Sequence, residues 1–140
     1  MTHLLDTDHI TFLQLQDGTE WAVLVGHIQR VGQQNVAVSV ISFHEQVLGV
    51  HEKLNQARRP PDLPRWYRRM GELFDLYSKT NLVVFDDPAA AVLEVLRKTP
   101  KLRIKPMDLR IAAIALSRNL VLVTRNVRDF GKVPGLRTED

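Results

Sequence analysis

Acidic residues follow several short apolar stretches of this chain, at positions where they could share one reaction centre. Asp6 and Asp8 come after Leu4-Leu5, Asp86 and Asp87 after residues 82–85, Asp129 lies beyond residues 120–123, and Glu45 and Asp108 lie near predicted helix starts. Carboxylates that share a crevice repel one another and raise each other's pKa unless a cation neutralises them. Oxygen ligands in a chain without cysteine favour Mg²⁺ or Mn²⁺. Such an ion can polarise a phosphodiester and activate an attacking water, which implies phosphodiester hydrolysis or phosphoryl transfer.

Each of these acidic side chains also has an ordinary structural interpretation, as a helix cap or a helix-dipole partner. Short polar side chains satisfy the free N–H groups at a helix start, and carboxylates are favoured in the first turn. The capping candidates are Asp6, Thr7 or Asp8 before a helix near Ile10, Ser42 with Glu45 as a capping box, Asp86 or Asp87 before Pro88, and Asp108 after Pro106. Taken singly, each residue fits capping. Taken together, they favour a metal site.

The elements that must position these residues alternate along the chain. Predicted strands lie at residues 3–5, 36–40, 82–85 and 120–123. Predicted helices lie at 10–15, 42–57, 63–78, 89–96 and 107–118, and a further one starts within 17–20 and is closed by Gly32. Short, continuously apolar strands between helices indicate a parallel α/β sheet with helices on both faces. Residues 127–140 leave room for one short edge strand. Ligands bind beyond the carboxyl ends of such strands, so Asp6 would point into the reactive crevice.

The length and composition narrow the possibilities further. A chain of 140 residues is expected to form a single domain, 1–140, with one layer of helices on each side of a sheet. The absence of cysteine excludes disulfides, thiolate metal sites and cysteine nucleophiles. The N-terminus lacks signal-peptide features, and no stretch has the roughly 18 apolar residues of a membrane span. We therefore expect a cytoplasmic protein with no membrane partner.

Basic residues cluster in two segments, 58–69 and 97–105, in a chain of formal net charge +3. Such clusters are typical of proteins that bind a polyanion such as RNA, although solvated surfaces have the same appearance. The first segment separates helices 42–57 and 63–78, which we expect to form a hairpin that stands out from the sheet. The five histidines lack the spacing of a zinc site and are interpreted as core or surface residues.

Four motifs occur in one order along the chain. They are Leu4-Leu5-Asp6-Thr7-Asp8, Ser42-x-x-Glu45, Asp108-x-x-Ile111-Ala112-Ala113-x-Ala115-Leu116 and Leu122-Val123-Thr124-x-Asn126-x-x-Asp129-Phe130. In this order and spacing they resemble PIN-domain ribonucleases and, among these, the VapC-type toxins of type II toxin–antitoxin pairs. The resemblance covers essentially the whole chain. It implies a three-layer α/β/α sandwich with four to five short, mainly parallel strands and the protruding helical hairpin.

The resemblance also implies a metal-dependent endoribonuclease in which Asp6, Glu45 and Asp108 are the catalytic carboxylates and coordinate Mg²⁺ or Mn²⁺. The fourth acidic position of the family holds Asn126 here, which puts a four-carboxylate, two-ion site in doubt. Asp129 could partly substitute for it, or Asn126 could orient a water. The remaining accessory positions are Asp8, the hydroxyls of Thr7 and Thr124 that would support the ligands, and Ser42.

Expected partners follow from the same resemblance. The substrate would be structured RNA, such as tRNA or ribosomal RNA, and a cognate antitoxin would insert a segment into the acidic groove. A homodimer is also expected. Candidate contacts to the RNA backbone are Lys101, Arg103 and Lys105, which precede Asp108, and Arg125 after the fourth strand.

Two other functions remain open. Asp6-Thr7-Asp8 also resembles the nucleophile and acid of haloacid-dehalogenase-type phosphatases, with Asp86-Asp87 as the later metal pair. No lysine stands in an evident strand-end context, however, and the chain has no room for the usual cap. The other alternative is a non-catalytic RNA-binding or protein-binding domain whose acidic residues all cap helices.

Overall fold

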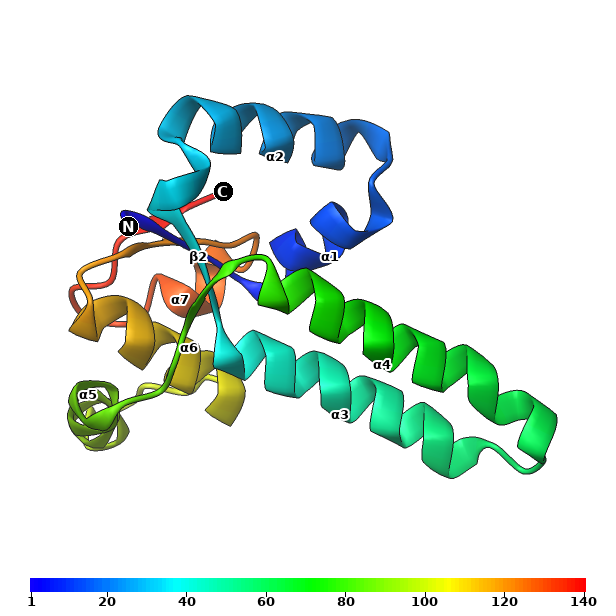
Figure 1. The fold of residues 1–140 in the computed structure, drawn as a ribbon. Coiled ribbons are helices and arrows are strands. Elements are labelled where there is room, and N and C mark those ends of the chain that lie inside the picture. The colour runs from blue at the N-terminus through cyan, green and yellow to red at the C-terminus, as the bar shows by residue number, and fades with distance from the viewer.

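The structure, a computed structural model, describes all 140 residues and contains one parallel sheet. Its strands are β1 (His3–Leu5), β2 (Val36–Ser39), β3 (Asn81–Val83), β4 (Val121–Val123) and β5 (Thr138–Glu139). Every neighbouring pair is parallel, in the order β3-β2-β1-β4-β5 (Figure 1). The central strand is therefore β1, and its carboxyl end lies between those of β2 and β4.

Seven helices connect and cover these strands. They are α1 (Thr7–Leu15), α2 (Gly18–Val31), α3 (Val40–Gln56), α4 (Leu63–Ser78), α5 (Asp87–Arg97), α6 (Pro106–Ser117) and α7 (Val127–Phe130). Single 3₁₀ turns occur at Gln33–Asn35 and Pro60–Asp62. None of the helices combines the length and the apolarity that a membrane-spanning segment requires. The predicted α/β class and parallel sheet are confirmed.

Successive residues of the central strands point to opposite faces of the sheet, and this creates two apolar cores. Leu4 and Ala37 pack against α5, α6 and α7, whereas Leu5 and Val38 pack against α1 to α4. In α6 the segment from Ile111 to Ala115 has no solvent exposure, as its nearly continuous apolar sequence predicts. The three-layer α/β/α arrangement is therefore confirmed.

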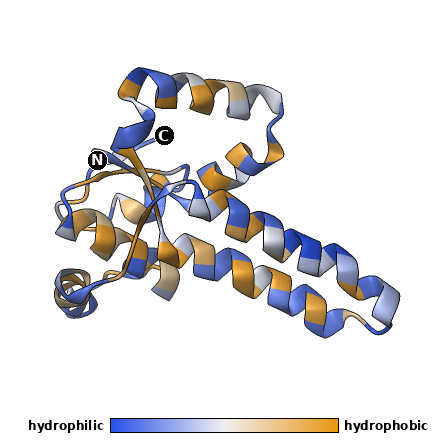
Figure 2. Ribbon diagram, in the orientation of Figure 1, coloured by the Kyte–Doolittle hydropathy of each residue, from blue (hydrophilic) through white to orange (hydrophobic).

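The helices α3 and α4 form the predicted hairpin, which extends away from the sheet (Figure 1). Pro60 and Pro61 lie in the turn between them. Proline inside a helix removes a backbone hydrogen bond, so the two prolines separate the helices. Figure 2 shows apolar residues alternating with hydrophilic ones along both helices, as expected for elements that pack mainly against each other. Phe43, near the start of α3, and Tyr77, near the end of α4, pack edge to face with their ring centres 5.1 Å apart.

Several element boundaries differ from the predictions by one to three residues. The first helix begins at Thr7 instead of Ile10, because the Asp6 side chain caps it. The third strand ends at Val83 instead of residue 85, because its partner strand ends at Ser39 and leaves nothing for the following residues to pair with. The third helix begins at Val40 instead of Ser42, and this shift changes the role of Glu45.

Candidate active site

Asp6 stands at the carboxyl end of β1 and is almost fully buried. Its Oδ1 accepts a hydrogen bond from the Thr7 backbone N–H at 2.8 Å, and its Oδ2 accepts one from Thr124 Oγ1 at 2.8 Å. The first contact caps α1, as one of the two interpretations of the sequence predicted. The second contact ties the carboxylate to the end of β4. Capping is therefore part of the role of Asp6, and it leaves the carboxylate at the sheet edge.

Glu45 lies in the second turn of α3 and takes no part in capping this helix. The N-cap is Ser39, whose Oγ accepts a hydrogen bond from the Ser42 backbone N–H at 3.1 Å. The predicted Ser42–Glu45 capping box is therefore wrong, because the helix starts directly where β2 ends. Instead, Thr7 Oγ1 lies 2.9 Å from Ser42 Oγ and 3.1 Å from Glu45 Oε1. Thr7 thus links the start of α1 to the carboxylate of α3.

Asp108 is the third residue of α6, and the N-cap position of this helix is occupied by Lys105. A carboxylate in the first turn is stabilised by the free N–H groups and the helix dipole, as predicted. Burial and, after it, the charge of Asp6 raise the pKa of Asp108, and Lys105 partly opposes this shift. Asp108 is therefore close enough to Asp6 for the two charges to interact.

The three carboxylates share an electrostatic environment that opposes their ionisation. Burial is the largest cause that raises the pKa of Asp6, Glu45 and Asp108, and neighbouring carboxylates raise each pKa further. Asp8 contributes to all three shifts. Hydrogen bonds from Thr124 to Asp6 and from Thr7 to Glu45 oppose these shifts because they stabilise the ionised forms. The structure thus brings the predicted central carboxylates together.

Asn126 and Asp129 mainly stabilise each other at the start of α7. Asn126 Nδ2 donates to Asp129 Oδ2 at 3.2 Å, and Asn126 Oδ1 accepts from the Asp129 backbone N–H. The amide and Lys132 lower the pKa of Asp129. Thr124 Oγ1, besides donating to Asp6, accepts from the Asn126 backbone N–H at 3.0 Å. The Asn126 backbone N–H therefore stabilises the turn at Thr124, and the Asn126 side chain is hydrogen-bonded to Asp129.

Asp86 serves a different part of the fold. Its Oδ1 accepts from the Ala89 backbone N–H and caps α5, and its Oδ2 forms an ion pair with Arg118 at 3.0 Å. The capping interpretation is correct here. Asp87 is exposed in the first turn of α5. Neither residue is among the charges that shift the pKa values of the three central carboxylates, which weighs against the phosphatase arrangement.

A polar network beside Glu45 escaped the sequence analysis. Gln14 of α1 and Gln46 of α3 hydrogen-bond each other reciprocally, at 3.0 and 3.2 Å. Tyr77 donates to Gln46 Oε1 at 2.8 Å, and Arg69 donates to Gln14 Oε1 at 2.6 Å. Burial and Glu45 together raise the pKa of Tyr77. The network joins α1, α3 and α4 behind the carboxylates. A glutamine directly after Glu45 was the available sequence signal.

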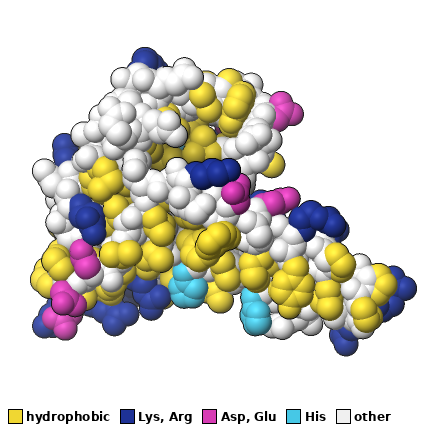
Figure 3. All heavy atoms as spheres, viewed as in Figure 1, with side chains coloured by type: hydrophobic (Ala, Val, Ile, Leu, Met, Phe, Trp, Pro, Cys, Tyr) yellow, Lys and Arg dark blue, Asp and Glu magenta, His cyan; other side chains and the backbone are white.

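The predicted RNA-contacting side chains all lie on the surface. Lys101, Arg103 and Lys105 are exposed in the loop before α6, and Arg125 is exposed just after β4. Other basic side chains gather at the tip of the α3–α4 hairpin (Figure 3). The loop that carries Lys105 leads into the first turn of α6, and Lys105 is the cation of this group whose charge acts on Asp108.

The donor set of the three carboxylates fits a hard divalent cation. Oxygen ligands suit Mg²⁺ and Mn²⁺, and a bound cation would offset both causes that raise the three pKa values, burial first and then repulsion between neighbouring carboxylates. In this conformation, however, no three acidic or histidine side chains are close enough to form a complete metal site. Magnesium commonly retains several water ligands and needs only one or two carboxylates, so the donor set meets its requirement.

No protein-family profile matches the chain. A tRNA(fMet)-specific endonuclease VapC of Salmonella typhimurium is 50% identical over 106 residues, which cover 75% of this chain and 74% of that protein. A protein of the same description from Shigella flexneri is 57% identical over 35 residues, or 25% of this chain and 26% of that protein.

Solved structures give a likeness over the full length of the chain. The DNA-bound VapBC structure from Salmonella typhimurium matches with a TM-score of 0.76 and 24% identity, covering 100% of this chain and 98% of that one. VapBC2 from Rickettsia felis, bound to a promoter DNA fragment, matches with a TM-score of 0.75 and 20% identity, covering 99% and 98%. At these identities the structures establish the fold.

A parallel sheet between two helical layers, with carboxylates converging at the end of its central strand, defines the PIN class of nucleases. The identity of 50% over about three quarters of a curated enzyme is too high for a likeness of fold alone. The chain belongs to the VapC family of toxin–antitoxin endonucleases. The resemblance inferred from the four motifs is confirmed.

Proposed function

We propose that this chain is a metal-dependent endoribonuclease in which Asp6, Glu45 and Asp108 hold Mg²⁺ or Mn²⁺ and the substrate is tRNA or ribosomal RNA. The observation that carries the proposal is the grouping of three part-buried carboxylates whose pKa values are raised first by burial and then by neighbouring acidic side chains, with Asp6 acting on both Glu45 and Asp108. A tRNA substrate is favoured by the name of the Salmonella relative, a tRNA(fMet)-specific endonuclease.

The residues of the chain divide the work as follows. Thr124 and Thr7 orient the carboxylates of Asp6 and Glu45 through their hydroxyl groups. Lys105 supplies positive charge beside Asp108, and Arg125 supplies it near the end of β4 for the RNA backbone. A bound divalent ion would polarise the scissile phosphate and lower the pKa of the attacking water.

The toxin role implies a cognate antitoxin, and the structural neighbours are toxin–antitoxin structures. An inhibitory segment of that partner would cover the acidic centre and keep RNA from it. We also propose that the protein acts in the cytoplasm, where its RNA substrate is present, and that it forms a homodimer.

The direct test is cleavage of total tRNA by purified protein with Mn²⁺, with Mg²⁺ and with EDTA. We expect metal-dependent cuts that disappear with EDTA and in the Asp108→Asn and Glu45→Gln variants. Asp87→Asn is the matched control, because this carboxylate is exposed at another helix start. Equal cleavage by the wild type and Asp108→Asn would contradict the assigned centre.

The same variants separate the alternatives. A phosphatase of the haloacid-dehalogenase type would lose all activity in Asp8→Asn, whereas the proposed centre would retain most of it because Asp8 is an accessory charge. A non-catalytic binding domain would show no cleavage in any variant, and Asp108→Asn would change only its stability.

A further inference from the structure

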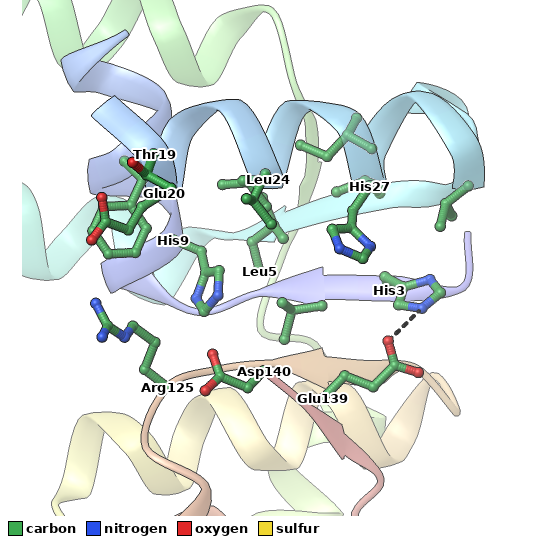
Figure 4. A pocket seen from close by; sticks show the side chains of 16 residues that line it. His3, Leu5, His9, Thr19, Glu20, Leu24, His27, Arg125, Glu139 and Asp140 are labelled. Atoms are coloured by element: carbon green, nitrogen blue, oxygen red, sulfur yellow. Dashed lines mark ion pairs between the residues drawn. The ribbon is translucent and has the colours of Figure 1, made fainter. Parts of the chain in front are cut away.

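A cavity of about 360 Å³ lies between α2 and the sheet, on the side of β1 that faces β4. Figure 4 shows Leu24 and His27 projecting into it from α2, with His9 opposite Arg125 at one end and the His3–Glu139 ion pair at the other. This volume is within the range of small-molecule pockets. The cavity is distinct from the cluster of three carboxylates, none of which lines it.

The lining of the cavity is amphipathic. Eight of its sixteen residues are hydrophobic, and the other eight are three histidines, Thr19, Arg125 and the acidic residues Glu20, Glu139 and Asp140. A groove for an apolar helix would present few polar groups, whereas this one offers donors and acceptors along its walls. His9 is 6% exposed, and its Nδ1 has no hydrogen-bond partner. The lining of the cavity therefore suits a flat ligand with polar edges.

Planar side chains gather at the end that carries Arg125. The Arg125 guanidinium lies 5.6 Å from the centre of the Phe12 ring, and the His9 ring meets Phe12 edge-to-face at 5.8 Å. Aromatic rings and guanidinium groups are the surfaces on which unpaired nucleic-acid bases stack. Arg125 is exposed, so its guanidinium can also contact a phosphate.

The residues at this end of the cavity are close in sequence to residues that hydrogen-bond the carboxylates. Arg125 follows Thr124, whose hydroxyl donates to Asp6. His9 lies on α1, and the first residue of that helix, Thr7, contacts both Asp6 and Glu45. A nucleotide whose phosphate lies at the carboxylates can therefore direct its base toward Phe12 and Arg125.

We propose that this cavity receives one unpaired base of the RNA substrate, from a nucleotide beside the scissile phosphate, which stacks on Phe12 and Arg125. The proposal rests on the ribonuclease function proposed above and adds a base-binding subsite to it. Proteins that recognise a particular RNA sequence mostly contact unpaired bases in single-stranded loops. A subsite that takes an unpaired base would therefore direct cleavage to loops.

The first test measures binding without cleavage. Wild-type protein with Mg²⁺ is titrated with AMP, GMP, CMP, UMP and ribose 5-phosphate, and the histidine ring C–H signals are followed by NMR. We expect at least one nucleotide to shift the His9 and His27 signals, with ribose 5-phosphate and the signal of His51, which does not line the cavity, as controls. Shifts caused equally by ribose 5-phosphate would mean phosphate attraction alone and would overturn the proposal.

Variants locate the binding surface. Phe12→Leu retains an apolar side chain but removes the aromatic face, and we expect it to weaken nucleotide binding about tenfold. Arg128→Gln is the matched control, since this exposed arginine follows the same strand but does not line the cavity. If no nucleotide shifts any histidine signal of the wild type, the base subsite is refuted. That result is expected of a pocket that receives a side chain of a protein partner.

The second test uses RNA that the enzyme cuts, with single abasic positions around the cut. One abasic position should lower kcat/KM about tenfold for the wild type and should cause no further loss in Phe12→Leu. If every abasic substrate is cut like the parent, the subsite is excluded and the ribonuclease function stands. If the wild type cuts no RNA, the function fails, and the NMR titration still decides the pocket.

Discussion

Thr124 Oγ1 donates a hydrogen bond to Asp6 Oδ2 at 2.8 Å across 118 positions of sequence. Both side chains are buried, at 0% and 6% exposure, so no water replaces this bond easily. It joins the carboxyl ends of the adjacent strands β1 and β4. The acidic centre thus depends on a hydroxyl that is not itself a metal ligand.

Replacing Thr124 by valine should impair the centre without changing the shape of the side chain. The ionised form of Asp6 loses a donor, so the pKa of Asp6 rises further and the pH profile of cleavage moves to higher pH. The lost buried bond should also cost about 1–3 kcal/mol of stability. Thr124→Ser should restore the wild-type pH profile. A Thr124→Val profile identical to the wild type would contradict this positioning role.

Removing a central charge should stabilise the metal-free protein. The pKa of Asp108 is raised in the folded state, so its protonated form favours folding at low pH. That stabilisation is lost as the pH rises from the unfolded-state pKa through the raised folded-state pKa. In EDTA at pH 7, Asp108→Asn should therefore have a higher Tm than the wild type, measured by calorimetry. The difference from the wild type should shrink at pH 4.

Binding of a divalent ion should stabilise the wild type and should leave the stability of Asp108→Asn nearly unchanged. A ligand at 100 times its Kd adds about 2.7 kcal/mol of stability. We expect Mn²⁺ to raise the Tm of the wild type and to have little effect on Asp108→Asn, with Asp87→Asn behaving as the wild type. Equal shifts in all three proteins would show that the ion binds elsewhere.

The helix start at Ser39 predicts opposite outcomes for two serines of one segment. Ser39→Ala removes the N-cap of α3 and should cost about 1 kcal/mol in urea unfolding. Ser42→Ala leaves the cap intact but removes a partner of Thr7, so its effect should be larger on cleavage than on capping. If Ser42→Ala lost more stability than Ser39→Ala, the result would contradict the Ser39 cap and support the capping box of Ser42 and Glu45.

The parallel sheet followed from the short apolar runs, and the grouping of Asp6, Glu45 and Asp108 followed from the resemblance of the four motifs, whereas the strand order needed the structure. The helix start at Ser39 also needed the structure, because Ser39 and Ser42 are equally good caps and only the end of β2 decides between them. The engagement of Asn126 with Asp129 depends on the short helix α7, which four residues of sequence do not reveal. The Phe12–Arg125 contact joins residues far apart in sequence and needed the folded chain.

The central position of β1 has a consequence for the timing of synthesis. Leu4 pairs with Ala37 on one side and with Leu122 on the other, so the first strand made by the ribosome waits for one of the last. Such distant pairing closes late in folding, because its loop entropy must be overcome first. A nascent chain that ends before Thr124 lacks the donor to Asp6. The acidic centre is therefore complete only after nearly the whole chain has been synthesised.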